Sequence, residues 1–562
     1  MIDEFLHEPR IAYFSMEIAL RDDIPTYSGG LGVLAGDTVR SAVDLKVPLV
    51  GVSLVSRAGY FRQEIDANGR QVEQPDLWEP RERAEPTEAK IAVLIEGREV
   101  WVRSWLYAVQ GERGGRQPVI LLDTDLDENQ GDDRQLTHYL YGGDQTYRIK
   151  QEMVLGIGGV RMLNALGFRV RQYHMNEGHS AFLALELLRR FARSPEEAGF
   201  ASRYDIPQVR ELCNFTTHTP VEAGQDQFPY DLVNRVMGGF VDLDELKTLA
   251  GQDRLNMTRL ALNLSEYVNG VAKRHAEVSQ RTYPGYHIHA VTNGVHPYTW
   301  TCASFARLYD AHLPGWCHEP ELLARIDQVA DEAVWAAHTQ ARHALIERVE
   351  ALAGLKFSPD LPILGFARRM TAYKRPDLLF SDLERLKAIA RKHPFQIVVA
   401  GKAHPRDEGG KQLIERLHGY RKALADTVPM VFFPNYGMAR ALDLVSGVDL
   451  WLNTPLRPLE ASGTSGMKAA FNGVPQLSVL DGWWLEGCIE GLTGWSIGSA
   501  SDSSNGNDAG SLYEKLEQKV LPLYCENRNG WIAVMKGAIG KNAAYFNSHR
   551  MMRRYATEAY IR

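Results

Sequence analysis

Cysteine is scarce in this sequence, with only five in 562 residues. The five are scattered along the chain, and none belongs to a CxxC pair. They are Cys213, Cys302, Cys317, Cys488 and Cys525. An odd, scattered set argues against a disulfide framework and predicts reduced thiols.

Long apolar runs and an excess of positive charge are also missing. No stretch is long enough to span a bilayer, and the acidic start MIDEFLHEPR shows no signal peptide. The net charge of −7 argues against a general binder of nucleic acid or anionic membranes. We therefore expect a soluble, cytoplasmic protein, in which a local basic pocket for a small anion is still allowed.

The second half of the chain alternates short β-branched runs with longer helical patterns. This alternation predicts βαβ units and a parallel sheet. The expected strands are residues 362–370, 395–403, 429–436, 448–455 and 475–482. They are apolar on both faces, as a sheet covered by helices requires.

The first half is less regular but follows a similar pattern. The expected strands here are residues 11–17, 118–126 and 211–220, and a long helix is expected over 146–167. We predict an α/β fold with two Rossmann-like, doubly wound domains that face a deep cleft. The expected regions are 1–293, 294–540 and a C-terminal helix in 541–562 that packs back on the first. The polar, Gly-rich stretch 499–511 is expected to be a surface loop.

The stretch EASGTSGMKAAFNG, residues 460–473, places a single lysine, Lys468, after a run of small residues. Small residues after a parallel strand let backbone N–H groups approach an anion, and the following helix adds its positive end. An ordinary turn with a solvated lysine is the commoner meaning of such a stretch. Against it, Lys468 falls in the first turn of the expected helix, where a positive charge is unfavourable. A partly buried lysine there would have a lowered pKa and can form an imine.

A second cluster, RRMTAYKR (368–375), follows a predicted strand at the sheet edge where α/β proteins bind ligands. A solvated basic surface is the usual fate of such a run. Two arginines directly after a buried strand cannot both point outward, however. Arginine offers planar paired donors and lysine a point charge, which together suit a phosphate group.

Several weaker segments carry polar or glycine residues at strand ends. The loop YSGGLGVLAGD (27–37) is weak evidence alone, and GIGG (156–159) lies in a helical pattern where close packing explains it. The segments at 174–182, 214–220 and 291–297 offer Asn, His and Glu, which suit a hydroxyl-rich ligand. His174 and His179 lack a convergent third ligand, so we expect no metal.

Together these segments resemble the α-glucan (glycogen/maltodextrin) phosphorylases, enzymes that depend on pyridoxal 5′-phosphate, and in particular their short bacterial and archaeal branch. The resemblance covers most of the chain, from YFSME to LDGWW. EASGTSGMKAAFN is close to the highly specific signature around the family's cofactor lysine. RRMTAYKR resembles its phosphate-binding segment, and GGLG, NEGHS, FTTHT and VTNGVHP match in chain order. Six motifs in order are hard to attribute to chance. The family has a glycosyltransferase B-type architecture.

The resemblance implies a role for each matching residue, and in it Lys468 holds the cofactor as a Schiff base. The residues implied to contact the cofactor are Arg368, Gly463, Thr464, Tyr436 and, on a looser match, Tyr13 and Glu17. Those implied to bind the substrate phosphate are Arg369, Lys374, Gly29 and Gly30. Those implied to hold the glucosyl unit are Glu460, Asn293, His218, Ser462 and Gly463. The implied catalytic set is Lys468, Arg369, Lys374, His218 and Glu460.

The family reaction is reversible phosphorolysis of α-1,4-glucan non-reducing ends by inorganic phosphate, which gives α-D-glucose 1-phosphate with retained configuration. Glycosyl transfer passes through an oxocarbenium-like state, yet the sequence shows no paired-carboxylate motif. A phosphate held by Arg369 and Lys374 can stabilise that cation and act as the nucleophile. The cofactor would serve as a proton donor and acceptor through its own phosphate. The usual form of the family is a homodimer.

Departures from the family bear on regulation and specificity. The chain starts almost at YFSME, without the N-terminal segment that carries phosphorylation and nucleotide control in animal relatives, so we expect no activation by AMP. Arg368 stands where many relatives have lysine, Phe471 where leucine or methionine is usual, and Trp483 and Trp484 follow the signature. These changes leave the preferred glucan length open.

Two other functions compete with this reading. A glycogen-synthase-type glycosyltransferase shares the architecture and the GGLG loop, but a nucleotide-sugar enzyme needs no imine-forming lysine at Lys468. An inactive glucan-binding protein would have lost Arg369, Lys374 or Lys468, and all three are present.

Overall fold

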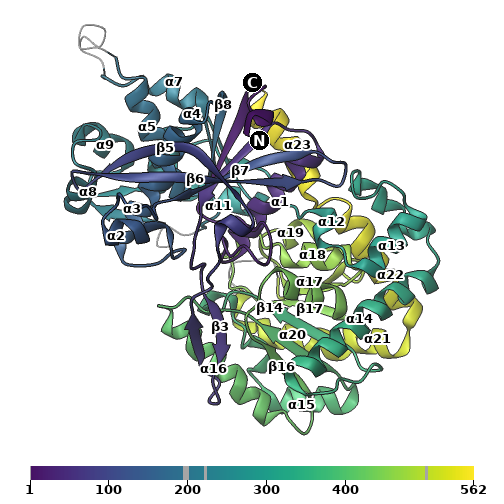
Figure 1. The fold of residues 1–562 in the computed structure, drawn as a ribbon. Helices are drawn as coiled ribbons and strands as arrows, with labels where there is room; N and C mark the ends of the chain where they lie inside the picture. The colour runs from purple at the N-terminus through teal and green to yellow at the C-terminus, as the bar shows by residue number, and fades with distance from the viewer. Residues whose placement is uncertain (1, 194–201, 221–224, 500–503, 562) are drawn as a thin grey trace.

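The computed structural model describes residues 2–193, 202–220, 225–499 and 504–561 (Figure 1). It contains two large β-sheets with strands of mainly parallel direction, each covered by helices. The α/β fold predicted from the sequence is confirmed.

The first sheet has nine strands in the order β13-β12-β9-β8-β1-β2-β7-β6-β5. The strands are β1 (Arg10–Ser15), β2 (Leu49–Leu54), β5 (Glu85–Ile95), β6 (Arg98–Gln110), β7 (Arg116–Asp123), β8 (Val170–Asn176), β9 (Cys213–Thr216), β12 (Tyr267–Gly270) and β13 (His289–Ala290). Strands β13 to β7 run parallel, and β6 and β5 continue the sheet antiparallel. The sequence did not predict the β5–β6 hairpin; β5 ends in the apolar run IAVLI, but one face of the strand is largely exposed.

The second sheet has six parallel strands in the order β16-β15-β14-β17-β18-β19. They are β14 (Ile363–Ala367), β15 (Gln396–Ala400), β16 (Met430–Phe433), β17 (Leu450–Asn453), β18 (Gln476–Val479) and β19 (Gly494–Ile497). All five predicted strands are present, and β19 was missed. The order is that of a doubly wound sheet whose switch point lies between its first and fourth strands, here β14 and β17. Ligands of such sheets bind beyond the carboxyl ends of those two strands.

The helices of the first half cover its sheet. They are α1 (Gly30–Asp44), α2 (Gly131–Arg134), α3 (Gln145–Met153), α4 (Gly159–Ala165), α5 (Phe182–Arg190), α7 (Ile206–Leu212), α8 (Tyr230–Met237), α9 (Leu243–Ala250), α10 (Met257–Asn263), α11 (Lys273–Thr282) and α12 (Pro297–Trp300). The strand expected over 211–220 is shorter than predicted, because α7 extends to Leu212. Among the described helices, none is long and apolar enough to cross a membrane.

The helix expected over 146–167 is formed by α3, a π-helical turn (Val154–Gly158) and α4. A Cβ on Gly156 would lie 2.5 Å from the backbone nitrogen of Leu183, and one on Gly159 would lie 2.4 Å from the ring of Phe14. Close packing therefore explains these glycines, as the sequence suggested.

The second half adds α13 to α23. They are α13 (Ala303–His312), α14 (Asp331–Ala353), α15 (Leu383–Lys392), α16 (Glu408–Ala423), α17 (Met438–Gly447), α18 (Ser465–Phe471), α19 (Trp484–Gly487), α20 (Asp508–Lys515), α21 (Leu521–Glu526), α22 (Arg528–Gly537) and α23 (Ser548–Tyr555). The surface loop expected over 499–511 is wrong at its end, where α20 begins. Asp508 is buried there and pairs with Arg375 and Arg457, each at 2.6 Å. Residues 500–503 of that stretch lie outside the described part of the chain.

The two halves contact each other through a small hairpin, β3 (Arg62–Ile65) and β4 (Gln71–Gln74), which lies beside α16 (Figure 1). Gln63 donates to the backbone oxygen of Gly401 at 2.9 Å and Gln71 to that of Ala403 at 3.0 Å. Both amides are buried, so these contacts fix one half against the other.

The C-terminal helix α23 packs on α1 of the first half (Figure 1). Ser41 and Ser548 share a hydrogen bond of 2.6 Å, and the Tyr560 hydroxyl lies 2.6 Å from Nδ1 of His174. The boundaries proposed for the three regions of the chain stay predictions.

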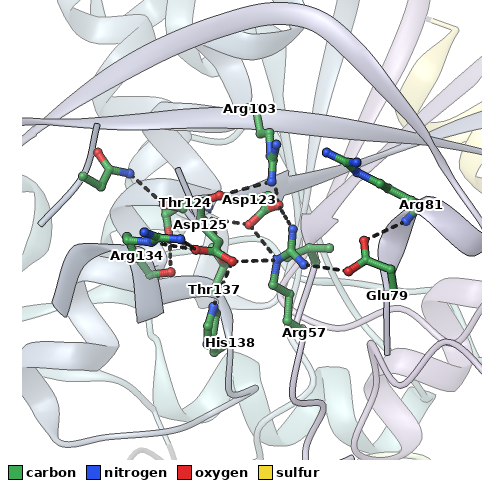
Figure 2. Close-up of polar contacts among 12 residues, drawn as sticks. Arg57, Glu79, Arg81, Arg103, Asp123, Thr124, Asp125, Arg134, Thr137 and His138 are labelled. Atoms are coloured by element: carbon green, nitrogen blue, oxygen red, sulfur yellow. Dashed lines mark hydrogen bonds and ion pairs between the residues drawn. The ribbon is translucent and has the colours of Figure 1, made fainter. Parts of the chain in front are cut away.

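Figure 2 shows a polar network at the carboxyl end of β7. Asp123 is buried and accepts hydrogen bonds from Arg57 at 2.8 Å, Trp105 at 2.8 Å and Arg103 at 3.3 Å. Burial would raise the pKa of Asp123, but Arg57 outweighs burial and lowers it. Arg57 lies in the segment after β2, so the network holds the chain that leads to the β3–β4 hairpin.

Candidate active site

Lys468 is the fourth residue of the short helix α18, and only 6% of it is exposed. Burial lowers the pKa of its amine to about 8, as the sequence predicted, although Asp37 opposes this shift. The Nζ atom lies 3.8 Å from the centre of the Trp300 ring. Within the described residues, the amine has no hydrogen bond or ion pair. It is therefore a buried amine that is easily deprotonated.

The ring beneath Lys468 is held by residues that the sequence analysis did not select. The indole nitrogen of Trp300 donates to Asp37 of α1 at 2.8 Å, and the backbone oxygen of Trp300 accepts from Asn472 at 2.7 Å. Asp37 closes the glycine-rich segment 27–37, and that position was the one available signal. Both halves of the chain therefore shape the surroundings of this lysine.

Three predicted residues meet at the switch point of the second sheet. The carboxylate of Glu460 accepts from Nη2 of Arg368 at 2.6 Å and from Nζ of Lys374 at 2.7 Å. Burial would raise the pKa of Glu460, but Arg368 and Lys374 outweigh it and lower the pKa to about 2. The resemblance gives Arg368, Lys374 and Glu460 separate ligands, whereas here the three bind one another.

Arg369 is exposed and points toward the glycine loop of the other half. A Cβ on Gly29 would lie 3.5 Å from Nη2 of Arg369, so the two carboxyl edges approach each other here. Although its surface is open to solvent, the surrounding protein desolvates the guanidinium, which would lower the pKa of Arg369; Tyr60 and Glu17 outweigh this and raise it above its ordinary value. The guanidinium therefore stays charged.

Glu17 fixes that glycine loop. Its carboxylate accepts the N–H groups of Ser28 at 2.6 Å and Gly29 at 3.0 Å, and the hydroxyl of Tyr141 at 2.8 Å. Gly30 is the first residue of α1. The sequence placed Glu17 near the cofactor, while its observed contacts are with the loop that faces Arg369.

Another group lies at the ends of β8 and β9. Glu177 accepts the N–H of Gly178 at 2.9 Å, the N–H of His218 at 2.7 Å and the hydroxyl of Thr219 at 2.9 Å. The Nε2 of His218 lies 2.6 Å from Oδ1 of Asn176. Burial lowers the pKa of His218 to about 3. The imidazole is neutral at pH 7 and suits hydrogen bonding to a hydroxyl group.

Asn293 is buried and held by its backbone. Its N–H donates to Val271 at 3.0 Å and its carbonyl accepts from Arg550 at 3.0 Å. The side-chain oxygen Oδ1 has no hydrogen-bond partner among the described residues. A buried oxygen of this kind is costly unless a ligand or water donates to it, so Asn293 is a candidate ligand contact.

The remaining predicted residues are placed as follows. Ser462 donates to the carbonyl of Gly463, whose φ is +75°, and the carbonyl of Thr464 accepts the N–H of Lys468. Burial raises the pKa of Tyr436, and the charge of Arg368 opposes part of that rise. Tyr13 is buried with its ring against that of His174. Burial raises the pKa of its hydroxyl, and Thr38 opposes the rise. The implied contact of Tyr13 with the cofactor stays a prediction.

A cavity of about 310 Å³ lies next to this region. It is lined by Gln145, Arg148, Gln225, Asp226, Gln227, Phe228 and Arg254. Arg148 pairs with Asp226 at 2.8 Å and lies over the ring of Tyr141, which in turn binds Glu17. The lining is largely charged and amide groups, which suits a hydroxyl-rich ligand.

A separate cluster joins Asp44, His296 and His549 from three parts of the chain. The Oδ2 of Asp44 lies 2.8 Å from Nε2 of His296 and 3.2 Å from Nε2 of His549. Because Nδ1 of His296 accepts the N–H of Thr299, its Nε2 carries the proton and donates to Asp44. Hydrogen bonding thus accounts for this pair.

Comparison with known proteins places these motifs in a family. Residues 240–489 match the carbohydrate phosphorylase family. The chain is 40% identical to a maltodextrin phosphorylase of Thermococcus litoralis, over 98% of this chain and 70% of that protein. It is 36% identical to a glycogen phosphorylase of Mycobacterium tuberculosis (98% and 70%), and 35% identical to one of Aquifex aeolicus (99% and 87%).

These alignments cover 98% of this chain, so they run through the first half as well as the second. The resemblance drawn from six motifs is confirmed: the chain belongs to the carbohydrate phosphorylase family.

Proposed function

We propose that this chain catalyses reversible phosphorolysis of α-1,4-glucans from their non-reducing ends, with inorganic phosphate as the acceptor. The product is α-D-glucose 1-phosphate with retained configuration. The observation that carries the proposal is Lys468, a buried amine with a lowered pKa and no partner among the described residues.

Pyridoxal 5′-phosphate fits the residues around this lysine. A deprotonated buried amine suits covalent attachment of an aldehyde, and Trp300 offers an aromatic face beside it. Arg368 supplies a nearby cation for the phosphate, and Tyr436 lies close to that charge. When bound, the cofactor supplies a phosphate group that gives and takes a proton.

The substrate phosphate is assigned to Arg369, Lys374 and the glycine loop at Gly29 and Gly30. Arg369 offers paired donors toward the loop, whose backbone is fixed by Glu17. The two cations would hold the phosphate within attacking distance of the reacting carbon, where its negative charge stabilises the oxocarbenium-like state.

The glucosyl unit is assigned to Glu460, Asn293, His218, Ser462 and Gly463. Asn293 offers an unsatisfied acceptor and His218 a neutral imidazole, both suited to sugar hydroxyls. Glu460 would exchange part of its contact with Arg368 and Lys374 for a sugar hydroxyl when phosphate arrives. The homodimer and the lack of activation by AMP remain predictions from the resemblance, and the cytoplasmic location remains a prediction from the composition.

The experiment is intact-mass measurement after incubation with pyridoxal phosphate and borohydride reduction. Wild type should gain one pyridoxyl group, and Lys468→Ala should gain none. Lys402→Ala is the matched control, because burial also lowers the pKa of Lys402 to about 8. It should keep the adduct. An adduct that persists in Lys468→Ala would contradict the role assigned to Lys468. Absence of an adduct in both proteins would contradict the proposal and favour a nucleotide-sugar transferase.

A further inference from the structure

Asp481 is a buried carboxylate two residues beyond β18, and it binds the loop that carries Glu460. Its Oδ2 accepts the backbone N–H of Glu460 at 2.9 Å, and its Oδ1 accepts the N–H of Gly482 at 2.9 Å. Both oxygens therefore hold backbone, and one of the two contacts is to a residue of the proposed site.

The residues after Asp481 bind the same loop. Gly482 has φ of +54°, and a Cβ there would lie 2.3 Å from the carbonyl oxygen of Ser462. Trp483 donates its N–H to that oxygen at 2.9 Å, and its ring lies 3.6 Å from a Cβ built on Gly463. The segment 481–483 thus clamps 460–463 at three successive points.

Residues 460–463, which this segment holds, form no helix or strand. This loop lies between β17 and α18, and Gly463 adopts the left-handed conformation within it. Glu460 follows β17, whereas Arg368 and Lys374, to which its side chain binds, follow β14 on the other side of the switch point. The placement of Glu460 therefore depends on its backbone anchor.

We infer that Asp481 is a positioning residue, which fixes Glu460 and the 462–463 turn against the reacting sugar. The inference rests on the proposed function, and it deepens that function by naming what sets the geometry of Glu460. Asp481 itself touches neither substrate nor cofactor in this assignment.

The charges around Asp481 agree with this role. Burial raises its pKa to about 6, the two backbone N–H groups oppose the rise, Glu460 adds to it and Arg274 opposes it. A buried carboxylate next to another carboxylate costs free energy. The hydrogen bonds that Asp481 accepts from the two backbone N–H groups account for its presence there.

The test compares Asp481→Asn with Asp449→Asn in the cofactor-loaded enzyme. Asp449 is a buried carboxylate away from Glu460 that accepts the N–H of Ile363 at 2.8 Å and also pairs with His338 and Arg342, so its change removes at least as much structural support. Misplacement of a catalytic group by about 1 Å costs about a hundredfold in rate. Asp481→Asn should therefore lose between about tenfold and a hundredfold in kcat, while Asp449→Asn keeps its kcat per folded enzyme.

A double-mutant cycle separates positioning from general destabilisation. If Asp481 acts through Glu460, Asp481→Asn should change kcat by less than about threefold in a Glu460→Gln background. Equal kcat in Asp481→Asn and Asp449→Asn, or the full loss again in the Glu460→Gln background, would overturn the inference. If Asp481→Asn does not fold, Asp481→Ser takes its place in the same cycle. Wild type without phosphate-dependent turnover would instead overturn the proposed function.

Discussion

At the scale of single residues, the site is built from charges that the fold keeps dry. Glu460 is 8% exposed and lies between two cations, and Lys468 is 6% exposed with an aromatic ring beneath it. Such groups reduce stability unless they are paired, so their retention points to chemistry rather than to folding. Replacing either residue should therefore change the free energy of unfolding in a direction that can be predicted.

Glu460→Gln should destabilise the protein. The change leaves Arg368 and Lys374 as buried cations without their carboxylate, which costs about 3 kcal/mol at pH 7. Because the folded pKa is depressed to about 2, the stabilisation is present above the unfolded pKa of about 4.3 and is lost as pH falls toward 2. Denaturant titration at pH 7 and pH 3 measures it. An equal difference between wild type and variant at both pH values would contradict the charge argument.

Lys468→Met should do the reverse in cofactor-free protein. A lysine whose folded pKa is lowered to about 8 opposes folding at every pH below that value. Its replacement should raise the free energy of unfolding by about 3 kcal/mol at pH 7. The gain should fade as pH rises from 8 to about 10.4, where the unfolded lysine also loses its proton. Denaturant titrations across that range test it, and a variant less stable than wild type at pH 7 would refute it.

At the scale of elements, the sequence predicted the five strands of the second sheet that border the site, but it missed β8, which ends at Asn176 beside His218. The five strands β14 to β18 are mainly apolar and buried along their whole length, because both faces of this sheet are covered. The sequence did not predict the hairpin β5–β6, in which one face of β5 is largely exposed, or the edge strand β19. The contacts Glu460–Arg368 and Asp37–Trp300 were beyond prediction, since they join segments that only the tertiary fold brings together.

The network of Figure 2 allows a test at this scale. Asp123→Asn weakens the buried pairing with Arg57 and should lower the free energy of unfolding by about 3 kcal/mol. Asp127→Asn is the control, because Asp127 also pairs with an arginine but its side chain is 96% exposed. That change should cost less than about 0.5 kcal/mol. Chemical denaturation of both variants decides the point, and equal losses would contradict the assigned role of burial.

At the scale of the whole molecule, segments far apart in sequence complete one another. Asp44 of α1, His296 and His549 of α23 form one buried cluster, and Tyr560 reaches His174 behind the first sheet. The sequence indicated that the C-terminal helix returns to the first half, but not which side chains it would use. His296 and Asp37 connect this cluster with the ring under Lys468.

Asp44→Asn should therefore loosen the C-terminal helix. The two histidines hold the pKa of Asp44 well below its usual value against the effect of burial, so its loss should cost about 3 kcal/mol at pH 7. Glu321→Gln is the control, since Glu321 also pairs with α23, through Arg553, but on the surface. It should change stability by less than about 0.5 kcal/mol. Hydrogen exchange of residues 548–560 should rise only in the first variant; unchanged protection there would contradict the account.

The measurement closest to the central claim follows the ³¹P NMR spectrum of wild-type enzyme, loaded with pyridoxal phosphate, during incubation with maltodextrin and inorganic phosphate. The account predicts that phosphate is consumed as α-D-glucose 1-phosphate appears in equal amount, with no free glucose and no β anomer. Release of free glucose, or a phosphate signal that never changes, would contradict it.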